Sequence, residues 1–173
     1  MAARIEHPGL LASMLLIFIT TACVSPDRAP TPKLAQRYID QGDGYRISGE
    51  FQKGIDSYSE AIRLDPEYEQ AYFYRGVVYE ILGQPEKSIQ DYDEVLRLDP
   101  EFLKAYNNRG GVYYRLSQYQ KAIQDYSEVI RLEPEYVNAY YSRGLAYRHL
   151  GEYDKAIQDY TEAIRLHPDY AYT

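Results

Sequence analysis

The chain has 173 residues, of which 45% are hydrophobic and 14% aromatic, with a net charge of −7 and one cysteine. This hydrophobic content predicts a folded protein and excludes a disordered one. A negative charge without a basic stripe argues against nucleic-acid binding, since neutralising phosphates supplies most of that affinity, and a single cysteine excludes an intramolecular disulfide framework.

The first 22 residues are expected to be an export signal. Arg4 lies in a short polar start, and an uncharged run from Gly9 to Ala22 follows it. This run is short for a membrane span, which needs about 20 apolar residues. It has the length of the hydrophobic region of a secretory signal, so residues 1–22 are assigned as a signal peptide.

The end of that run, Thr20-Thr21-Ala22-Cys23, resembles a bacterial lipobox. The resemblance implies that Cys23 is thioether-linked to diacylglycerol and becomes the mature N-terminus of a lipoprotein. Three alternatives stay open: a buried unmodified thiol, cleavage without lipidation, and an uncleaved anchor. Because Val24 is not the aspartate that signals inner-membrane retention, the resemblance favours the periplasmic side of an outer membrane, if the cell is Gram-negative.

Residues 23–34 are predicted to be an extended tether. Three of its residues are prolines, at Pro26, Pro30 and Pro32. Proline-rich segments stay extended and unpacked, so this stretch is expected to separate the anchor from the folded part.

From residue 35 onward the sequence repeats every 34 residues. One glycine, one proline and two tyrosines recur in register: Gly42, Gly76, Gly110 and Gly144; Pro66, Pro100, Pro134 and Pro168; Tyr38, Tyr72, Tyr106 and Tyr140; Tyr58, Tyr92, Tyr126 and Tyr160. A fixed period of roughly 20–50 residues predicts a repeat array, in which each unit buries its apolar face against its neighbours.

Each unit is predicted to be an antiparallel pair of helices. In the second unit, apolar residues with helical spacing run from Gln70 to Leu82. Pro85 stands where a first-turn proline is tolerated and opens a second stripe. Asp99 ends that stripe, because the residue before Pro100 is driven away from helical dihedral angles.

This pattern resembles the tetratricopeptide repeat (TPR), whose framework of aromatic, glycine, tyrosine, aromatic and proline is complete in all four units. The resemblance implies an all-α fold, a TPR solenoid of four antiparallel helix pairs that form a short right-handed superhelix. The units are assigned to residues 35–68, 69–102, 103–136 and 137–170, followed by a tail at 171–173. The repeated glycine is expected where the two helices of a pair approach most closely.

Departures from the family pattern concern the first unit and two framework positions. The first alanine of the family is replaced by Gly54 in unit one and Ser88 in unit two, and is kept as Ala122 and Ala156. The leucine of the family is replaced by Gln41, Arg75, Arg109 and Arg143. The first unit also carries Gly44 and Gly49, each expected to weaken its helix by roughly 0.5–1 kcal/mol relative to alanine. Unit one is therefore predicted to be the least stable.

Two sets of charged residues recur on the second helices and are expected on a solvated outer face. The pairs three residues apart are Glu60/Arg63, Glu94/Arg97, Glu128/Arg131 and Glu162/Arg165, and those four apart are Lys87/Asp91, Lys121/Asp125 and Lys155/Asp159. Each such pair contributes about 0.2–0.5 kcal/mol to a helix.

Nothing in the sequence indicates catalysis. No Cys/His cluster has metal-ligand spacing, and no glycine-rich phosphate loop occurs. The carboxylates and most of the 21 tyrosines follow the repeat, which indicates packing positions. We therefore predict no enzymatic activity, no cofactor and no metal.

The resemblance implies that the first helix of each pair lines a concave groove that holds a partner. The groove residues singled out are Phe73, Tyr74, Val77, Ile81, Lys104, Asn107, Asn108, Tyr114, Arg115, Tyr141 and Arg148. The other positions that the resemblance assigns to the groove are Gln36, Ile39, Asp40, Asp43, Arg46, Ile47, Gln70, Glu80, Gly111, Asn138, Ser142, Leu145 and His149. By this mapping Phe73, Val77 and Ile81 face solvent and form an apolar pocket. The carboxylate clamp of some TPR proteins is not supported, because Phe73 and Val77 stand where it needs lysine and asparagine.

The chemistry of these positions favours an acidic-hydrophobic peptide. Asn107 and Asn108 can bond a peptide backbone through paired donor and acceptor groups. Lys104, Arg115 and Arg148 are expected to form a mildly basic wall. The alternative is that all of these are ordinary variable surface residues.

The last helix, predicted from Tyr153 to Leu166, carries Ile157 and Ile164 where an internal repeat would face the next unit. Burying an isoleucine side chain stabilises by about 1.5–3 kcal/mol. Residues 169–173 are too short for the capping helix that such arrays commonly carry, so we expect a homodimer through this edge, or a partner that covers it.

These expectations predict a non-catalytic, lipid-anchored adaptor of the bacterial cell envelope that binds protein or peptide partners. The first alternative is a soluble cytoplasmic TPR scaffold or chaperone-like adaptor without a lipid anchor. The second is an accessory domain for an enzyme whose catalytic module belongs to a partner chain.

Overall fold

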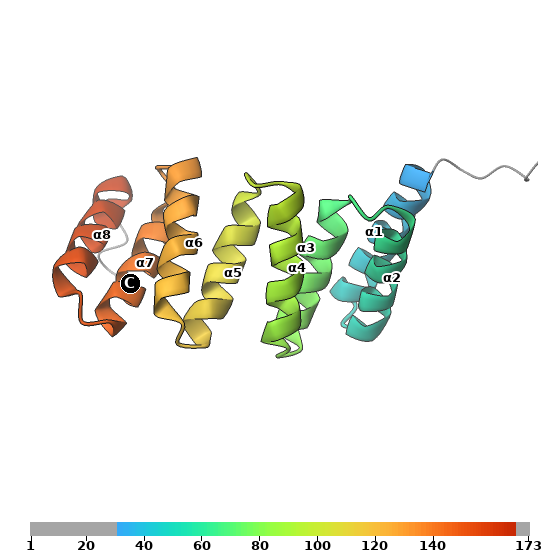
Figure 1. Ribbon diagram of the computed structural model, residues 1–173, viewed down its shortest axis with the longest axis horizontal. Helices are drawn as coiled ribbons and strands as arrows, with labels where there is room; N and C mark the ends of the chain where they lie inside the picture. The colour runs from blue at the N-terminus through green and yellow to red at the C-terminus, as the bar shows by residue number, and fades with distance from the viewer. Residues whose placement is uncertain (1–30, 169–173) are drawn as a thin grey trace, which may run out of the picture.

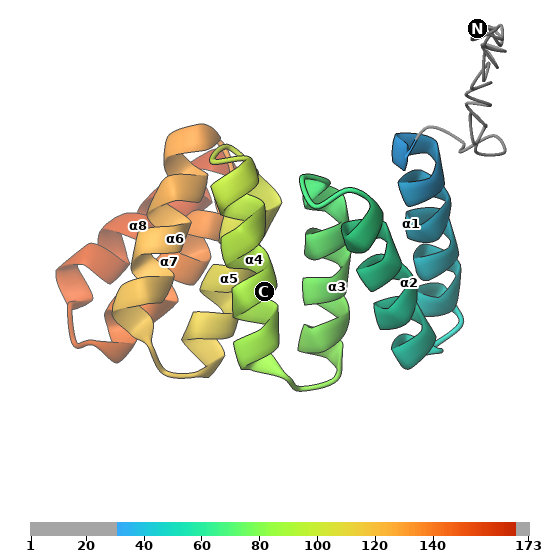
Figure 2. The same ribbon diagram turned by 45° about the vertical axis from the view of Figure 1, so that its right-hand side comes forward.

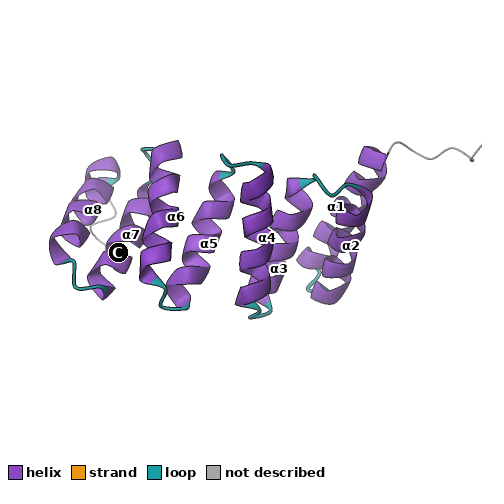
Figure 3. Ribbon diagram, in the orientation of Figure 1, coloured by secondary structure: helices purple, strands orange, loops and turns teal. Residues whose placement is uncertain are grey.

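The computed structural model describes residues 31–168, which form eight α-helices. In chain order they are α1 (Thr31–Ile47), α2 (Phe51–Leu64), α3 (Glu69–Ile81), α4 (Pro85–Leu98), α5 (Leu103–Arg115), α6 (Tyr119–Leu132), α7 (Val137–His149) and α8 (Tyr153–Leu166). The helices pair in sequence order and the four pairs follow one another in a row (Figure 1), joined by short loops (Figure 3). The predicted all-α solenoid of four helix pairs is confirmed. The signal peptide, Cys23 and the tail lie outside the described residues.

Two predictions about helix ends are confirmed and one is wrong. Pro85 occupies the first turn of α4, and α8 spans Tyr153–Leu166 as predicted. The predicted tether extends too far, because α1 already begins at Thr31. Pro32 is compatible with this start, since the first N–H groups of a helix have no partner within the helix.

The repeated glycine lies where the two helices of a pair meet, as predicted. A Cβ atom added at Gly76 would lie 3.0 Å from the Tyr92 ring, and one added at Gly144 only 2.7 Å from the Tyr160 ring. Both distances are shorter than ordinary van der Waals contact. Only glycine therefore lets the tyrosine of the second helix pack against the backbone of the first.

The turn between the helices of a pair needs a residue with positive φ. Gly49, Gly83 and Gly151 supply it with φ of +66° to +79°, and Ser117 stands at the same position of unit three with φ of 58°. The prediction that Gly49 weakens a helix is thus wrong, because it lies in the turn after α1. Glycine adopts this conformation without the steric cost that a side chain brings.

The arginines at the family's leucine position hold buried aspartates. Arg75 donates two hydrogen bonds to Asp91, of 2.9 and 2.7 Å, and the same arrangement recurs one and two units later. Asp91 is only 5% exposed. The prediction that Lys87 and Asp91 pair on a solvated face is therefore wrong, and so are the equivalent predictions for units three and four. In each unit the aspartate is buried between the two helices, where the arginine of the facing helix binds it. The glutamate–arginine pairs three residues apart are confirmed, with N–O distances of 2.6–2.9 Å.

The first helices form one side of the solenoid. α1 contacts α3, α3 contacts α5, and α5 contacts α7, whereas the described second helices do not contact one another. The first helices therefore lie closer together and line the inner face. Figure 2 shows the same row of helix pairs from another side, with α1 and α2 at its right-hand end. No helix within residues 31–168 is both long and apolar enough to span a membrane.

Candidate partner-binding groove

A pocket of about 300 Å³ opens on the inner face between α3, α5 and α7. Its lining residues are Glu80, Asn107, Asn108, Gly111, Arg115, Tyr126, Asn138, Tyr141 and Ser142. All of them except Tyr126 stand at groove positions that the sequence resemblance assigned. Tyr126 was assigned to packing alone, and no sequence signal distinguished its hydroxyl, which lines the pocket, from its buried ring.

A hydrogen-bonded network crosses the pocket from one repeat to the next. Arg115 on α5 binds Glu80 on α3 at 2.7 Å. The Tyr92 hydroxyl donates to the same carboxylate at 3.0 Å and accepts a hydrogen bond from Asn108 at 3.4 Å. Arg115 is therefore not an unpaired cation of a basic wall, as the sequence suggested, because Glu80 of the preceding repeat is within reach of its guanidinium.

Two tyrosine hydroxyls stay protonated at neutral pH: that of Tyr126, which lines the pocket, and that of Tyr92, which is bonded to the lining residues Glu80 and Asn108. Burial raises the pKa of Tyr126 to about 12, and burial together with the charge of Glu80 raises the pKa of Tyr92 even further. Both hydroxyls therefore act as neutral hydrogen-bonding groups. The Tyr126 hydroxyl is hydrogen-bonded to Ser142 on α7.

The predicted apolar pocket of unit two is largely absent. Phe73 is only 9% exposed, and its ring packs 5.1 Å from Phe102 and 5.5 Å from Tyr74. Val77 is half-buried against the same cluster, and only Ile81, at 53%, is exposed. The mapping failed here because the side chain at position 73 turns toward the interface with the next repeat instead of toward the groove.

The two aromatic groove candidates Tyr74 and Tyr114 hold neighbouring elements together. Tyr74 stacks on Tyr58, with ring centroids 5.9 Å apart. Tyr114 packs edge-on against Tyr119 and His149, both at 5.5 Å. Each ring is half-buried by these contacts, so only part of it faces the groove.

The remaining candidates lie on the accessible surface. Tyr141 is 43% exposed and its ring contacts Tyr160 at 5.8 Å. Lys104 and Arg148 are exposed, and neither forms an ion pair with another residue of the described part of the chain. These two cations are the part of the predicted basic wall that the structure leaves available.

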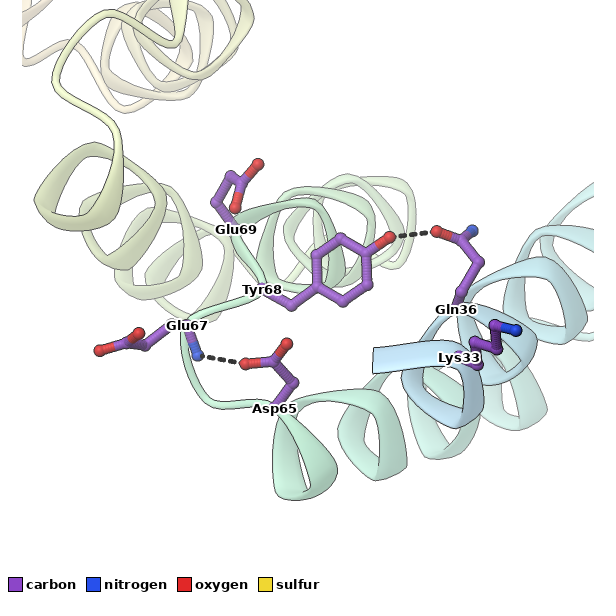
Figure 4. A pocket seen from close by; sticks show the side chains of 6 residues that line it. All are labelled: Lys33, Gln36, Asp65, Glu67, Tyr68 and Glu69. Carbon is purple, nitrogen blue, oxygen red and sulfur yellow. Dashed lines mark hydrogen bonds between the residues drawn. The ribbon is translucent and has the colours of Figure 1, made fainter. Parts of the chain in front are cut away.

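A second hollow, of about 440 Å³, lies at the start of α1 against the turn between α2 and α3 (Figure 4). Figure 4 shows Tyr68 reaching across this hollow to α1, where its hydroxyl donates a hydrogen bond to the Gln36 side-chain oxygen. The backbone N–H of Glu67 donates to Asp65 at 3.2 Å. The carboxylates here do not make a metal site: within residues 31–168 no group of His, Cys, Asp or Glu side chains could hold a metal ion.

Comparisons with known proteins agree with this architecture. The family model described as tetratricopeptide repeat matches residues 69–102 and 137–170, and one described as TPR repeat matches residues 42–83 and 110–151. The chain belongs to the tetratricopeptide repeat family. No curated protein sequence matches this TPR chain.

Several solved TPR structures resemble the chain. The crystal structure of MamA is 25% identical with a TM-score of 0.76, over 82% of this chain and 83% of that one. The first TPR of Spaghetti (RPAP3), bound to the HSP90 peptide SRMEEVD, is 24% identical with a TM-score of 0.67, over 69% of this chain and 95% of that one. YrrB, described as a TPR protein with an unusual peptide-binding site, is 21% identical with a TM-score of 0.71, over 79% of this chain and 71% of that one.

Proposed function

We propose that this TPR protein is a non-catalytic adaptor that binds an extended segment of a partner protein along the inner face of α3, α5 and α7. The observation that carries the proposal is the pocket of about 300 Å³ that these three helices share. A site formed by three consecutive repeats suits a ligand that extends along the solenoid axis.

Side-chain amides supply the main recognition chemistry of this pocket. Asn107 donates to Asn108 at 3.4 Å, and Asn108 donates to Tyr92. Each amide has two N–H donors and an oxygen with two lone pairs, so these bonds leave capacity on both residues. Adjacent amides can therefore pair with the N–H and C=O groups of an extended peptide, independent of its sequence.

Charge and aromatic surface add selectivity. Lys104 and Arg148 are exposed cations on α5 and α7, and the exposed Tyr141 ring offers an apolar contact beside the amides. An acidic segment with aromatic or aliphatic side chains fits these groups best. The peptide bound to the first TPR of Spaghetti and the peptide-binding site of YrrB support the use of this fold for peptide ligands.

The test begins with a phage-displayed library of 12-residue peptides selected on the full chain in detergent micelles. The dissociation constant of a selected peptide is then measured by fluorescence anisotropy for wild type, Asn107→Ala, Asn108→Ala and Gln124→Ala. Loss of an interface anchor costs about 1 kcal/mol or more, so we expect each asparagine variant to bind at least about fivefold more weakly. Gln124, exposed on the second helix α6, is the matched control and should have no effect. Equal affinity for the asparagine variants and wild type, at unchanged helicity by circular dichroism, would contradict the groove.

We further propose that the protein is held at the bacterial cell envelope by a lipid on Cys23. The motif Thr20-Thr21-Ala22-Cys23 and the uncharged run before it support this proposal. A lipid anchor would place the groove on the periplasmic side of the membrane, where the adaptor docks envelope proteins. A soluble cytoplasmic scaffold is the alternative, and membrane partitioning of Cys23→Ser distinguishes the two.

A further inference from the structure

We propose that the exposed face of α8 is a second docking surface, separate from the groove, which takes a partner helix with the pattern of this chain's own first helices. This α8 face consists of Tyr153, Ile157, Tyr160, Thr161 and Ile164. The partner helix carries a small residue and, four positions later, an arginine. The three internal junctions between repeats supply the template for this assignment.

The α8 face has the composition of a covered surface. At the equivalent positions of earlier units, Ile55 is 6% exposed and Leu96 is 9% exposed, because the first helix of the next repeat covers them. On α8 the corresponding Ile157 and Ile164 are 62% and 43% exposed. The other four equivalents, Ile62, Ile89, Ile123 and Ile130, are half-buried. The apolar stripe that is buried or half-buried between units is therefore more open to solvent at this end.

The helices that cover the internal junctions share two features. Each places an alanine in the junction with no exposed surface, at Ala71, Ala105 and Ala139. Each also extends an arginine, four residues further on, back to the second helix of the preceding unit. The pairs are Arg75 with Ser59 at 3.0 Å, Arg109 with Asp93 at 2.6 Å, and Arg143 with Ser127 at 3.0 Å.

Thr161 presents the acceptor for such an arginine. Ser127, at the same position one unit earlier, donates its hydroxyl to the carbonyl of Ile123 at 2.7 Å and accepts from Arg143. Thr161 donates to the carbonyl of Ile157 at the same 2.7 Å, and no described residue donates to it. Its hydroxyl oxygen therefore points its lone pairs to the side where the next repeat's arginine would lie.

Tyr160 indicates a second polar contact. Its hydroxyl oxygen is buried and has no hydrogen-bond partner among the described residues. The equivalent hydroxyls of Tyr92 and Tyr126 bond to Asn108 and Ser142, on the first helix of the following unit. A covering helix with a polar residue directly before its arginine would supply a hydrogen-bond partner to this buried hydroxyl, whose unsatisfied state destabilises the protein.

A partner protein fits this surface better than a second copy does. At the junction positions where α5 has Ala105 and Val112, α1 has Arg37 and Gly44, so the outer face of α1 cannot cover α8 in a head-to-tail pair. A second α8 would bury the isoleucines against each other but would bring no arginine to Thr161, because its Arg165 is bound to its own Glu162. The homodimer predicted from the sequence is thus the competing occupant in the test.

The probe is a fluorescein-labelled peptide that copies residues 136–150, which include all of α7, titrated onto the full chain in detergent micelles. Three receptors are compared: wild type, Ile157→Glu with Ile164→Glu, and Thr161→Asp. We expect the double variant to bind at least tenfold more weakly. Thr161→Asp should bind several-fold more tightly, since Asp93 at that position forms an ion pair with Arg109. A peptide with Arg143→Ala should lose that gain.

A free peptide of this length must be ordered on binding, so the same helix is also joined covalently. Residues 137–150 are copied in place of 171–173, which continues the 34-residue register. We expect this extension to raise the unfolding midpoint relative to the same extension carrying Ala139→Glu and Arg143→Glu. The proposal is overturned if the two extended proteins have the same unfolding midpoint. It is also overturned if Thr161→Asp gives no gain, or if wild type alone sediments as a dimer that Ile157→Glu dissociates.

Discussion

Arg109 on α5 binds two aspartates from two different repeats. It donates bonds of 2.9 and 2.6 Å to Asp125 on α6 of its own unit, and a third of 2.6 Å to Asp93 on α4 of the preceding unit. Asp125 is 4% exposed, so this contact lies inside the helix pair. A position that is apolar in the family pattern has become a polar link that fixes one repeat to the next.

Breaking this link from one side is expected to be costly. Arg109→Leu leaves the Asp125 carboxylate buried without its partner, which should destabilise by about 3–5 kcal/mol. The double variant Arg109→Leu with Asp125→Ala should recover most of that loss, because no buried charge remains. Unfolding in urea measures the stability of the single and the double variant. Arg131→Leu, which removes an exposed pair with Glu128, is the control and should cost less than about 1 kcal/mol. A double variant no more stable than Arg109→Leu would contradict the explanation.

Two glycine-to-alanine substitutions should change the stability of the protein in opposite directions. Gly76→Ala places a Cβ atom 3.0 Å from the Tyr92 ring and 3.2 Å from the Asp91 side chain, and overpacking of this kind costs about 1–3 kcal/mol. Gly44→Ala meets no atom within 4 Å on the exposed face of α1, so it should stabilise by about 0.5–1 kcal/mol. Thermal unfolding followed by circular dichroism compares them. Equal effects would show that the close approach at Gly76 is not the constraint.

Replacing Ser117 by glycine should stabilise the third repeat. Its φ of 58° lies in the left-handed region, where a residue with a side chain is less favourable than glycine by about 1–2 kcal/mol. The converse change, Gly83→Ser, places the same strain in unit two and should destabilise by a similar amount. The two unfolding midpoints are expected to move in opposite directions. A loss of stability in Ser117→Gly would contradict this prediction.

Alkaline pH should destabilise the protein through its buried tyrosines. Burial raises the pKa of Tyr126 to about 12 from an ordinary value of 10.0. The folded state therefore binds the phenolic proton more tightly, and this contribution is full below pH 10 and is lost as the pH rises toward 12. For Tyr126 alone it amounts to about 3 kcal/mol. Unfolding in urea between pH 9 and 12 should show a smaller loss for Tyr126→Phe than for wild type, and an identical loss would contradict the prediction.

Lipidation of Cys23 predicts a change of compartment without a change of fold. Cys23→Ser removes the thiol that would carry the diacylglycerol, so the variant should leave the detergent phase on phase separation. Its helicity by circular dichroism should equal that of wild type, because Cys23 precedes all eight helices of the described residues, of which the first begins at Thr31. Mass spectrometry of wild type should show the lipid on Cys23. A variant that partitions as wild type does would contradict the lipoprotein assignment.

The sequence by itself determined the repeat and its helices because these depend on local signals. The 34-residue period, the helical spacing of apolar residues and prolines such as Pro85 each act on neighbouring residues, and the predicted bounds of α8 agree with those observed. The exposure of Ile157 and Ile164 also followed from the repeat, since the equivalent residues of earlier units face the next first helix.

Contacts between side chains far apart in the chain were decided only by the tertiary structure. Asp91 is buried because Arg75, 16 residues earlier on the facing helix, binds it there, and not Lys87 on its own helix. Arg115 is neutralised by Glu80, 35 residues earlier in the neighbouring repeat. Periodicity assigns a residue to a helix face, but the length and charge of the side chains that the next helix brings against that face decide whether it is buried, paired or open to a partner.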